Sequence, residues 1–302
     1  MQFLYFLESL RMPGLNELML AITNLGDEMA FLVIALVIFW CVDKRAGYFL
    51  ISVGFSGTVI SQFMKIACRV PRPWVLDPEF TILEEAREAA SGYSFPSGHS
   101  QASVGTFGSI ARTAKKTWVR IVGIVICVLV PFSRMYLGVH TPADVLVGAA
   151  LSLVLIFALY PLVYRKEGRG FKWLLLGMLV MAAAYMVYVM CYPFPVDVDA
   201  ANLFHSQENA SMLLGSVFAI CMVYLLDSKW THFSTEAVWW AQILKAVLGI
   251  GLALLVKEGL EAPLEAVLPV LAARGVRYFL IVLVVGGLWP MTFRYFAKLG
   301  RK

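Results

Sequence analysis

The stretch VLVGAALSLVLIFALYPLVY, residues 145–164, contains twenty residues without a charged side chain. Because a helix needs about 20 mainly apolar residues to cross the hydrocarbon core of a bilayer, this stretch predicts a transmembrane helix near 142–164. Comparable segments recur along the chain, and the sequence predicts nine spans near residues 28–44, 46–66, 98–113, 118–134, 142–164, 172–191, 210–227, 238–256 and 276–296. We therefore expect an all-α fold, a polytopic membrane helix bundle.

The composition of the whole chain agrees with this class. Of its 302 residues, 60% are hydrophobic and 15% are charged, and the mean hydropathy is +0.76. In an ordinary soluble domain roughly a quarter of the residues are charged, so these values exclude that class as well as a disordered chain or a coiled coil. The net charge of +5 is too small to indicate a nucleic-acid partner.

The residues before the first span predict two short helices. The segment MQFLYFLESLRM, residues 1–12, places apolar side chains on one helical face, so we expect it to lie on the membrane surface. A second short helix is expected at 15–23. No cleavable signal peptide is expected, because the first apolar stretch lacks a basic start and contains Glu8.

The distribution of positive charge predicts the orientation in the membrane. One set of loops carries fifteen Lys and Arg residues and four acids, whereas the alternate set carries nine basic and sixteen acidic residues. The basic set consists of Lys44, Arg45, Arg112, Lys115, Lys116, Arg120, Arg165, Lys166, Arg169, Lys172, Lys229, Arg294, Lys298, Arg301 and Lys302. Loops rich in Lys and Arg stay in the cytoplasm, which places the N-terminus outside and the C-terminus inside. Lys245 lies within a span near its inner end, where it is expected to reach toward the headgroups.

A first outward-facing segment, KIACRVPRP at residues 65–73, combines cations with prolines. Lys65 ends the second predicted span, and Arg72 lies between two prolines that stiffen the backbone around it. Cations at a membrane boundary often only contact lipid headgroups. A rigid guanidinium also suits bidentate recognition of a phosphate group.

A second outward-facing segment, GYSFPSGHS at residues 92–100, precedes an apolar run. Pro96, Ser97 and Gly98 have the pattern of a helix start, and a simple N-cap is one interpretation. A helix N-terminus that offers a hydroxyl and a glycine N–H also binds anions. His99 would then lie in the first turn, beside a bound phosphate.

A third outward-facing segment, SRMYLGVHTPAD at residues 133–144, contains a second histidine. Thr141 and Asp144 have the spacing of a capping box. The same carboxylate, four residues after His140, can accept a hydrogen bond from one imidazole nitrogen and leave the other nucleophilic. Arg134, one or two helical turns earlier, adds a cation for phosphate.

Together the three segments resemble the type 2 phosphatidic acid phosphatase superfamily. The resemblance rests on Lys65, Arg72-Pro73, Pro96-Ser97-Gly98-His99, Ser133-Arg134, His140 and Asp144. It implies that His140 is the nucleophile that takes the phosphoryl group, that Asp144 orients and activates it, and that His99 is the general acid for the leaving oxygen. It also implies a phosphate-binding cradle made of Lys65, Arg72, Ser97, the N–H of Gly98 and Arg134.

The resemblance covers only the first part of the chain. We expect a catalytic helical core at residues 1–192 and three additional transmembrane helices, of unknown role, at residues 193–302. Three cations and a helix N-terminus supply the charge stabilisation that phosphoryl transfer requires. No metal and no cofactor are therefore expected, and no carboxylate cluster in the outer loops has metal-ligand spacing beside the histidines.

The expected function is hydrolysis of lipid phosphates or diphosphates at an extracytoplasmic site of the cell membrane, through a phosphohistidine intermediate, with a membrane lipid as substrate. Undecaprenyl diphosphate is favoured, by analogy with the family alone, followed by phosphatidic acid, phosphatidylglycerol phosphate and sphingosine 1-phosphate. The alternatives are a sugar phosphatase similar to glucose-6-phosphatase, a lipid or sugar phosphotransferase, and a non-enzymatic transporter or scaffold. The sequence does not predict the oligomeric state.

Overall fold

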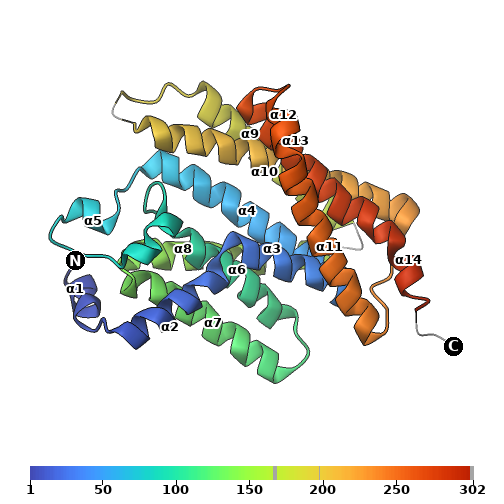
Figure 1. Cartoon of the computed structure of the whole chain (residues 1–302), viewed down its shortest axis with the longest axis horizontal. Coiled ribbons are helices and arrows are strands. Elements are labelled where there is room, and N and C mark those ends of the chain that lie inside the picture. The colour runs from blue at the N-terminus through green and yellow to red at the C-terminus, as the bar shows by residue number, and fades with distance from the viewer. Residues whose placement is uncertain (166–168, 197, 300–302) are drawn as a thin grey trace. The chain divides into compact units, whose positions relative to one another are not determined.

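The computed structural model describes residues 1–165, 169–196 and 198–299. Within these residues every regular element is a helix (Figure 1). Seven helices in them are long and apolar enough to cross a membrane, and there are eight if a bent pair near the N-terminus counts as one span. The all-α prediction is confirmed, whereas nine spans and the positions of the termini stay predictions. Lys166, Arg301 and Lys302 of the basic set lie outside the described residues.

The helices group into two compact units. The first unit contains Met1–Leu32 and Ser56–Tyr160, and the second contains Val33–Phe55 and Pro161–Lys302. These units are defined by contacts within the structure and not by function. The boundary expected after residue 192, between a catalytic core and additional helices, stays a prediction.

The first unit holds the three segments 65–73, 92–100 and 133–144. Its helices are α1 (Gln2–Ser9), α2 (Pro13–Thr23), the second half of α4 (Lys44–Cys68), α5 (Pro73–Leu76), α6 (Gly98–Thr113), α7 (Thr117–Tyr136) and most of α8 (Pro142–Tyr164). Glycines let these helices approach closely. A Cβ on Gly123 of α7 would lie 2.8 Å from the carbonyl oxygen of Phe107 in α6, and one on Gly148 of α8 would lie 2.5 Å from that of Ser97. This packing fixes the starts of α6 and α8 against each other.

The N-terminal helix α1 packs on the loop that joins the first two segments. Its Tyr5 hydroxyl donates to Asp77, and Glu8 accepts from the backbone N–H of Thr81. Arg11, just after the helix, donates to the carbonyl oxygens of Thr81 and Tyr136. Helix α1 therefore holds this loop against the end of α7.

The chain bends between the short helix predicted at 15–23 and the first predicted span. The helical segments Pro13–Gly26 and Glu28–Val42 meet at an angle of 53°. The bend consists of a 3₁₀ turn, Asn24–Gly26, and Asp27, whose side chain accepts from the backbone N–H of Met29. The short helix predicted at 15–23 and the helix predicted at 28–44 are thus present as two separate helices.

The second unit contains the helices that follow the core. They are α3 (Glu28–Val37), which begins in the first unit, its π-helical extension (Ile38–Val42), the first half of α4, α9 (Arg169–Cys191), α10 (Ala200–Leu226), α11 (Trp239–Gly259), α12 (Glu261–Glu265), α13 (Val270–Leu283) and α14 (Phe293–Phe296). Helix α10 packs against α9 and α13. A Cβ on Gly215 of α10 would lie 2.1 Å from the carbonyl oxygen of Gly275 in α13, so small residues allow this contact.

Two expectations about the second unit are wrong. Helix α10 begins at Ala200, ten residues before the predicted start, because Asp199 caps it through the backbone N–H of Asn202 and its polar Glu208 pairs with Arg274 at 2.8 Å. Lys245 does not reach the headgroups. Its side chain is fully buried, 4.5 Å from the ring centroid of Phe293, and donates to the carbonyl oxygen of Thr235.

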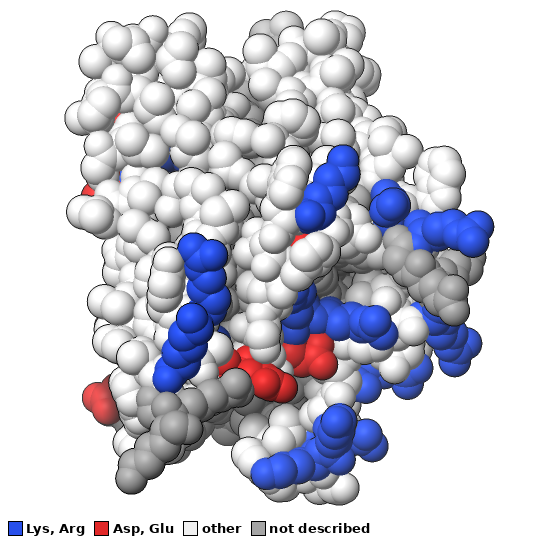
Figure 2. Space-filling view, turned by 90° about the vertical axis from the view of Figure 1, so that its right-hand side faces the viewer, with Lys and Arg blue, Asp and Glu red and all other residues white. Residues whose placement is uncertain are grey.

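The surface carries large apolar side chains, as expected where lipid replaces water. Trp118 is 64% exposed, Leu146 is 67% exposed and Phe157 is 60% exposed. Figure 2 shows a broad surface without charged side chains and a separate region in which Lys and Arg gather. Such a surface suits a helix bundle surrounded by hydrocarbon.

Candidate active site

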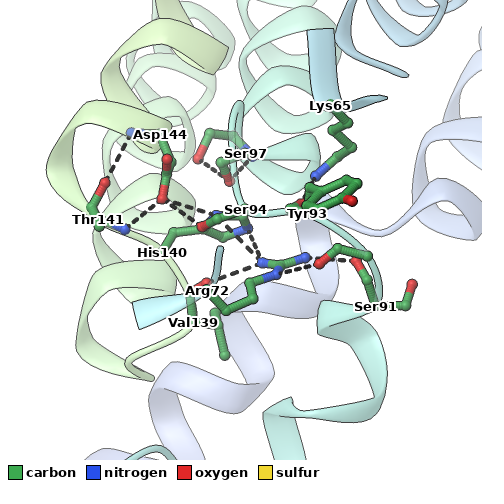
Figure 3. Close-up of polar contacts among 12 residues, drawn as sticks. Lys65, Arg72, Ser91, Tyr93, Ser94, Ser97, Val139, His140, Thr141 and Asp144 are labelled. Carbon is green, nitrogen blue, oxygen red and sulfur yellow. Dashed lines mark hydrogen bonds and ion pairs between the residues drawn. The ribbon is translucent and has the colours of Figure 1, made fainter. Parts of the chain in front are cut away.

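The structure brings the segments 65–73, 92–100 and 133–144 together in the first unit (Figure 3). Arg72 from the first segment contacts His140 from the third. Ser94 from the second segment contacts both His140 and Asp144. Residues that are far apart in the sequence therefore form one polar cluster.

Arg72 is anchored by main-chain oxygens from two loops. Its side chain donates to the carbonyl oxygens of Ser91, Gly92 and Val139 at 2.7–3.0 Å. The residue is 6% exposed. These three bonds fix the plane of the guanidinium, and its NH1 atom lies 3.0 Å from Nε2 of His140.

These contacts favour one tautomer of His140. A guanidinium nitrogen can only donate, and NH1 of Arg72 lies closer to Nε2, at 3.0 Å, than to Nδ1, at 3.4 Å, which favours a lone pair on Nε2. The proton is then on Nδ1, which lies 3.3 Å from Oγ of Ser94. Ser94 in turn donates to Oδ2 of Asp144 at 2.7 Å.

Asp144 has a structural role as well as a place beside His140. Its Oδ2 accepts from the backbone N–H of Thr141, and its own N–H donates to the Thr141 hydroxyl, so the predicted capping box is confirmed. The distance from Oδ2 to Nδ1 of His140 is 3.6 Å, which is beyond hydrogen-bond range. The Ser94 hydroxyl bridges the two side chains instead.

Burial and charge keep the His140 imidazole neutral. The side chain is 2% exposed. Burial, followed by the positive charges of Arg72 and Arg134, holds the pKa of His140 well below its usual range. A neutral imidazole is the nucleophilic form.

The start of α6 forms another wall of the cluster. Ser97 caps the helix, and its hydroxyl accepts from the backbone N–H of Ser100. A Cβ built on Gly98 would meet no atom within 4 Å, so open space lies beside this helix start. On the other side of the loop, Lys65 donates to the carbonyl oxygen of Tyr93 at 2.7 Å.

The remaining two predicted residues lie beside the N-terminal helix bend. Arg134 is fully buried and donates through NH1 to the hydroxyl of Thr23. Its Nε and NH2 have no hydrogen-bond partner among the described residues. His99 occupies the first turn of α6, close enough for the charges of Arg134 and Arg72 to act on it.

Sequence reasoning missed Ser94 and Thr23. Ser94 lies within the quoted second segment, but a serine in a loop has no pattern that indicates a contact with a carboxylate fifty positions away. Thr23 ends a short helix 111 positions before Arg134. No local signal connects the two residues.

The described residues contain no group of three or more His, Cys, Asp and Glu side chains placed to hold a metal ion. The groups around His140 are mainly cations and N–H donors. Such donors suit an anion.

Comparisons with known proteins agree with this chemistry. The sequence profile described as the PAP2 superfamily matches residues 45–168, and a profile described as a PAP2 superfamily phosphatase transmembrane extension matches residues 211–302. Phosphatidylglycerophosphatase B of Bacillus subtilis is 33% identical over 162 residues, which are 49% of this chain and 75% of that protein. The chain therefore belongs to the PAP2 superfamily of phosphatases.

Further relatives are named for other phosphorylated lipids. An undecaprenyl-diphosphatase of Sulfolobus acidocaldarius is 31% identical over 44% of this chain and 64% of that protein. Sphingosine-1-phosphate phosphatase 2 of Mus musculus is 26% identical over 57% of this chain and 49% of that protein. No solved structure matches the chain significantly.

Proposed function

We propose that this protein is an integral-membrane lipid phosphatase that transfers the phosphoryl group of a lipid phosphate or diphosphate to His140 and then to water. The observation that carries the proposal is the cluster in which Arg72, Ser94 and His140 meet. It offers a neutral imidazole next to a cation that is anchored to the backbone. Phosphoryl transfer needs such a nucleophile together with fixed positive charge.

In the first step Nε2 of His140 attacks phosphorus. The N–P bond forms while the bond from phosphorus to the lipid oxygen breaks, and His99 gives its proton to that oxygen. The bound phosphate group next to His99 favours the protonated imidazole that this step requires. In the second step water attacks phosphorus, His99 takes a proton from the water, and inorganic phosphate leaves His140.

Asp144 and Ser94 support His140 throughout. When Nε2 binds phosphorus, the imidazole becomes positively charged. The hydrogen bond from Nδ1–H to Ser94, and from Ser94 to the Asp144 carboxylate, stabilises this charge. The same chain of bonds keeps the lone pair on Nε2.

The phosphate cradle consists of Lys65, Arg72, Arg134 and the start of α6 with Ser97 and Gly98. The Nε and NH2 groups of Arg134, which have no hydrogen-bond partner in the described part of the chain, are proposed to bind phosphate oxygens. The open space beside Gly98 lies at a helix N-terminus, where backbone N–H groups favour an anion. These groups neutralise the phosphate without a metal ion, so activity should persist in EDTA.

The site is proposed to face the outside of the cell membrane. The three segments lie at the ends of predicted spans opposite to the loops of the basic set, and such basic loops stay in the cytoplasm. A lipid substrate carries its phosphate at headgroup depth, next to the ends of spans. Undecaprenyl diphosphate is the favoured substrate, and the names of the relatives also support phosphatidylglycerol phosphate and sphingosine 1-phosphate.

The test is phosphate release by the purified full chain in detergent micelles. We would assay undecaprenyl diphosphate, phosphatidylglycerol phosphate, phosphatidic acid, sphingosine 1-phosphate and glucose 6-phosphate, with His140→Ala as the control. We expect one of the lipids to be hydrolysed fastest, and the activity to survive EDTA.

Other results would point to the alternatives. A preference for glucose 6-phosphate would indicate a sugar phosphatase. Transfer to an added lipid or sugar hydroxyl, faster than to water, would indicate a phosphotransferase. No release from any substrate by a folded protein would leave a transporter or scaffold.

A further inference from the structure

We infer that the bend that precedes the first predicted span, residues 23–27, is a built part of the phosphate site. In it, Thr23 positions Arg134 and Gly26 supports His99. The inference rests on the proposed function, because it concerns how two of the proposed site residues are held. The bend lies before residue 45, where the match to the PAP2 superfamily profile begins.

The first contact is between Thr23 and Arg134. The Thr23 hydroxyl lies 2.9 Å from NH1 of Arg134, and both side chains are buried, at 4% and 0% exposure. Because Nε and NH2 have no partner among the described residues, this bond is what fixes the direction of the guanidinium. Without it, a buried cation on a long side chain can turn, and its free N–H groups would no longer face one position.

The second contact is between Gly26 and His99. A Cβ on Gly26 would lie 3.0 Å from the carbonyl oxygen of His99 and 3.3 Å from its Cβ. It would also lie 2.7 Å from a methyl group of Val130. Only a residue without a side chain therefore lets the bend lie flat against the first turn of α6 and the neighbouring part of α7.

Both contacts come from one short turn and reach two different helices. Thr23 is the last residue of α2, Gly26 ends the 3₁₀ turn, and Asp27 follows, near enough for its charge to act on Arg134. Thr23 and Gly26 both precede the point at which the chain changes direction by 53°. This turn thus contacts both the cation and the general acid.

The test for Thr23 compares Thr23→Val with Thr23→Ser in the purified full chain. Valine keeps the shape and removes the hydroxyl, so we expect orthovanadate to inhibit roughly tenfold more weakly and KM to rise more than kcat falls, because a hydrogen bond to a charged group is lost. Thr23→Ser should restore both values. The matched control is Thr106→Val, which removes a buried hydroxyl that donates to the carbonyl oxygen of Ala102.

A double-mutant cycle shows whether Thr23 acts through Arg134. In an Arg134→Ala background, Thr23→Val should have no further effect on the inhibition by orthovanadate. The inference is overturned if Thr23→Val is inhibited by orthovanadate as strongly as the wild-type protein and has the same KM and kcat. It is also overturned if Thr23→Val weakens the inhibition by the same factor in the Arg134→Ala background. If the wild-type protein itself lacks phosphatase activity, the proposed function fails instead.

The test for Gly26 uses Gly26→Ala, whose Cβ would press on the carbonyl oxygen of His99 and on a methyl group of Val130. We expect it to slow hydrolysis of a lipid monoester more than that of p-nitrophenyl phosphate, because only the former needs a proton from His99. Gly14→Ala is the control, since a Cβ there meets no atom within 4 Å. Equal effects on both substrates would contradict the link to His99, and an unfolded Gly26→Ala protein would leave the decision to the Thr23 variants.

Discussion

The NH1 atom of Arg72 lies 3.0 Å from Nε2 of His140. The proposed nucleophile therefore contacts a cation that is fixed by carbonyl oxygens of Ser91, Gly92 and Val139. A phosphate group that binds to Arg72 is brought next to the imidazole. The contact thus aligns the nucleophile before the substrate arrives, and the guanidinium can transfer its hydrogen bond to a phosphate oxygen.

This arrangement predicts how Arg72 controls the pH dependence of the reaction. The positive charge of Arg72 contributes to the low pKa of His140, after burial. Arg72→Gln removes that charge, so the pKa of His140 rises and more of the imidazole is protonated at mildly acidic pH. The acidic limb of the profile of kcat/KM against pH should shift to higher pH in Arg72→Gln.

Arg72→Lys is the matched control for charge. It keeps the cation but loses the bonds to the backbone, so its activity should fall while its acidic limb stays near that of the wild-type protein. The same substrate is used for all three proteins, so the titration of its phosphate cancels in the comparison. An acidic limb that does not move in Arg72→Gln would contradict the electrostatic account.

Ser94 is predicted to act through His140 and Asp144. Ser94→Ala removes the hydroxyl that bridges Nδ1 and Oδ2, and the direct distance of 3.6 Å is too long to replace it. The loss of a hydrogen bond to a charged group should lower kcat by about tenfold, with a smaller effect on KM. Ser52→Ala, which removes a buried hydroxyl that donates to the carbonyl oxygen of Tyr48, is the control.

Asp144→Asn shows whether Ser94 and Asp144 act as one unit. In that background Ser94→Ala should have little further effect on kcat. Full additivity of the two changes would show that the serine does not work through the carboxylate.

The two histidines should differ in their dependence on the leaving group. A general acid contributes roughly 10²–10⁴-fold, and most where the leaving oxygen is a poor leaving group. His99→Ala should therefore lose far more activity on a lipid monoester than on p-nitrophenyl phosphate, with a diphosphate in between. His140→Ala should abolish activity on all three. The reverse pattern, in which His140→Ala shows the dependence and His99→Ala does not, would exchange the two roles.

The orientation in the membrane can be tested with single cysteines. Glu85 and Lys116 are both exposed, in loops that the charge distribution assigns to opposite sides. In a background without the five native cysteines, of which Cys68 and Cys191 are exposed, an impermeant thiol reagent should label Glu85→Cys in intact cells. It should label Lys116→Cys only after lysis. The opposite result would place the site in the cytoplasm.

Local signals in the sequence predicted the helices that begin the site. The predicted span at 98–113 coincides with α6, and the span at 142–164 coincides with α8. Both begin with a residue that caps the helix, Ser97 in one case and Thr141 in the other. Caps and apolar runs are properties of neighbouring residues, so a single sequence is enough to recognise them.

Contacts between distant segments could not be predicted in the same way. The resemblance to the superfamily placed Arg72 and His140 in one site, but it did not predict that NH1 of Arg72 lies 3.0 Å from Nε2 of His140. Lys245 was expected at the headgroups because its sequence position does not reveal that Phe293 covers it. The support of Arg134 by Thr23 likewise depends on the bend between two helices.

The central claim, a phosphoryl group on His140, is tested most directly by trapping it. The full chain would be mixed for milliseconds with a substrate labelled with ³²P in its terminal phosphate and quenched in alkaline detergent, which preserves phosphohistidine. We predict label that is stable to base and labile to acid, located in the peptide that contains His140, and absent from His140→Ala. Label on the peptide that contains His99, or continued turnover by His140→Ala, would contradict the account.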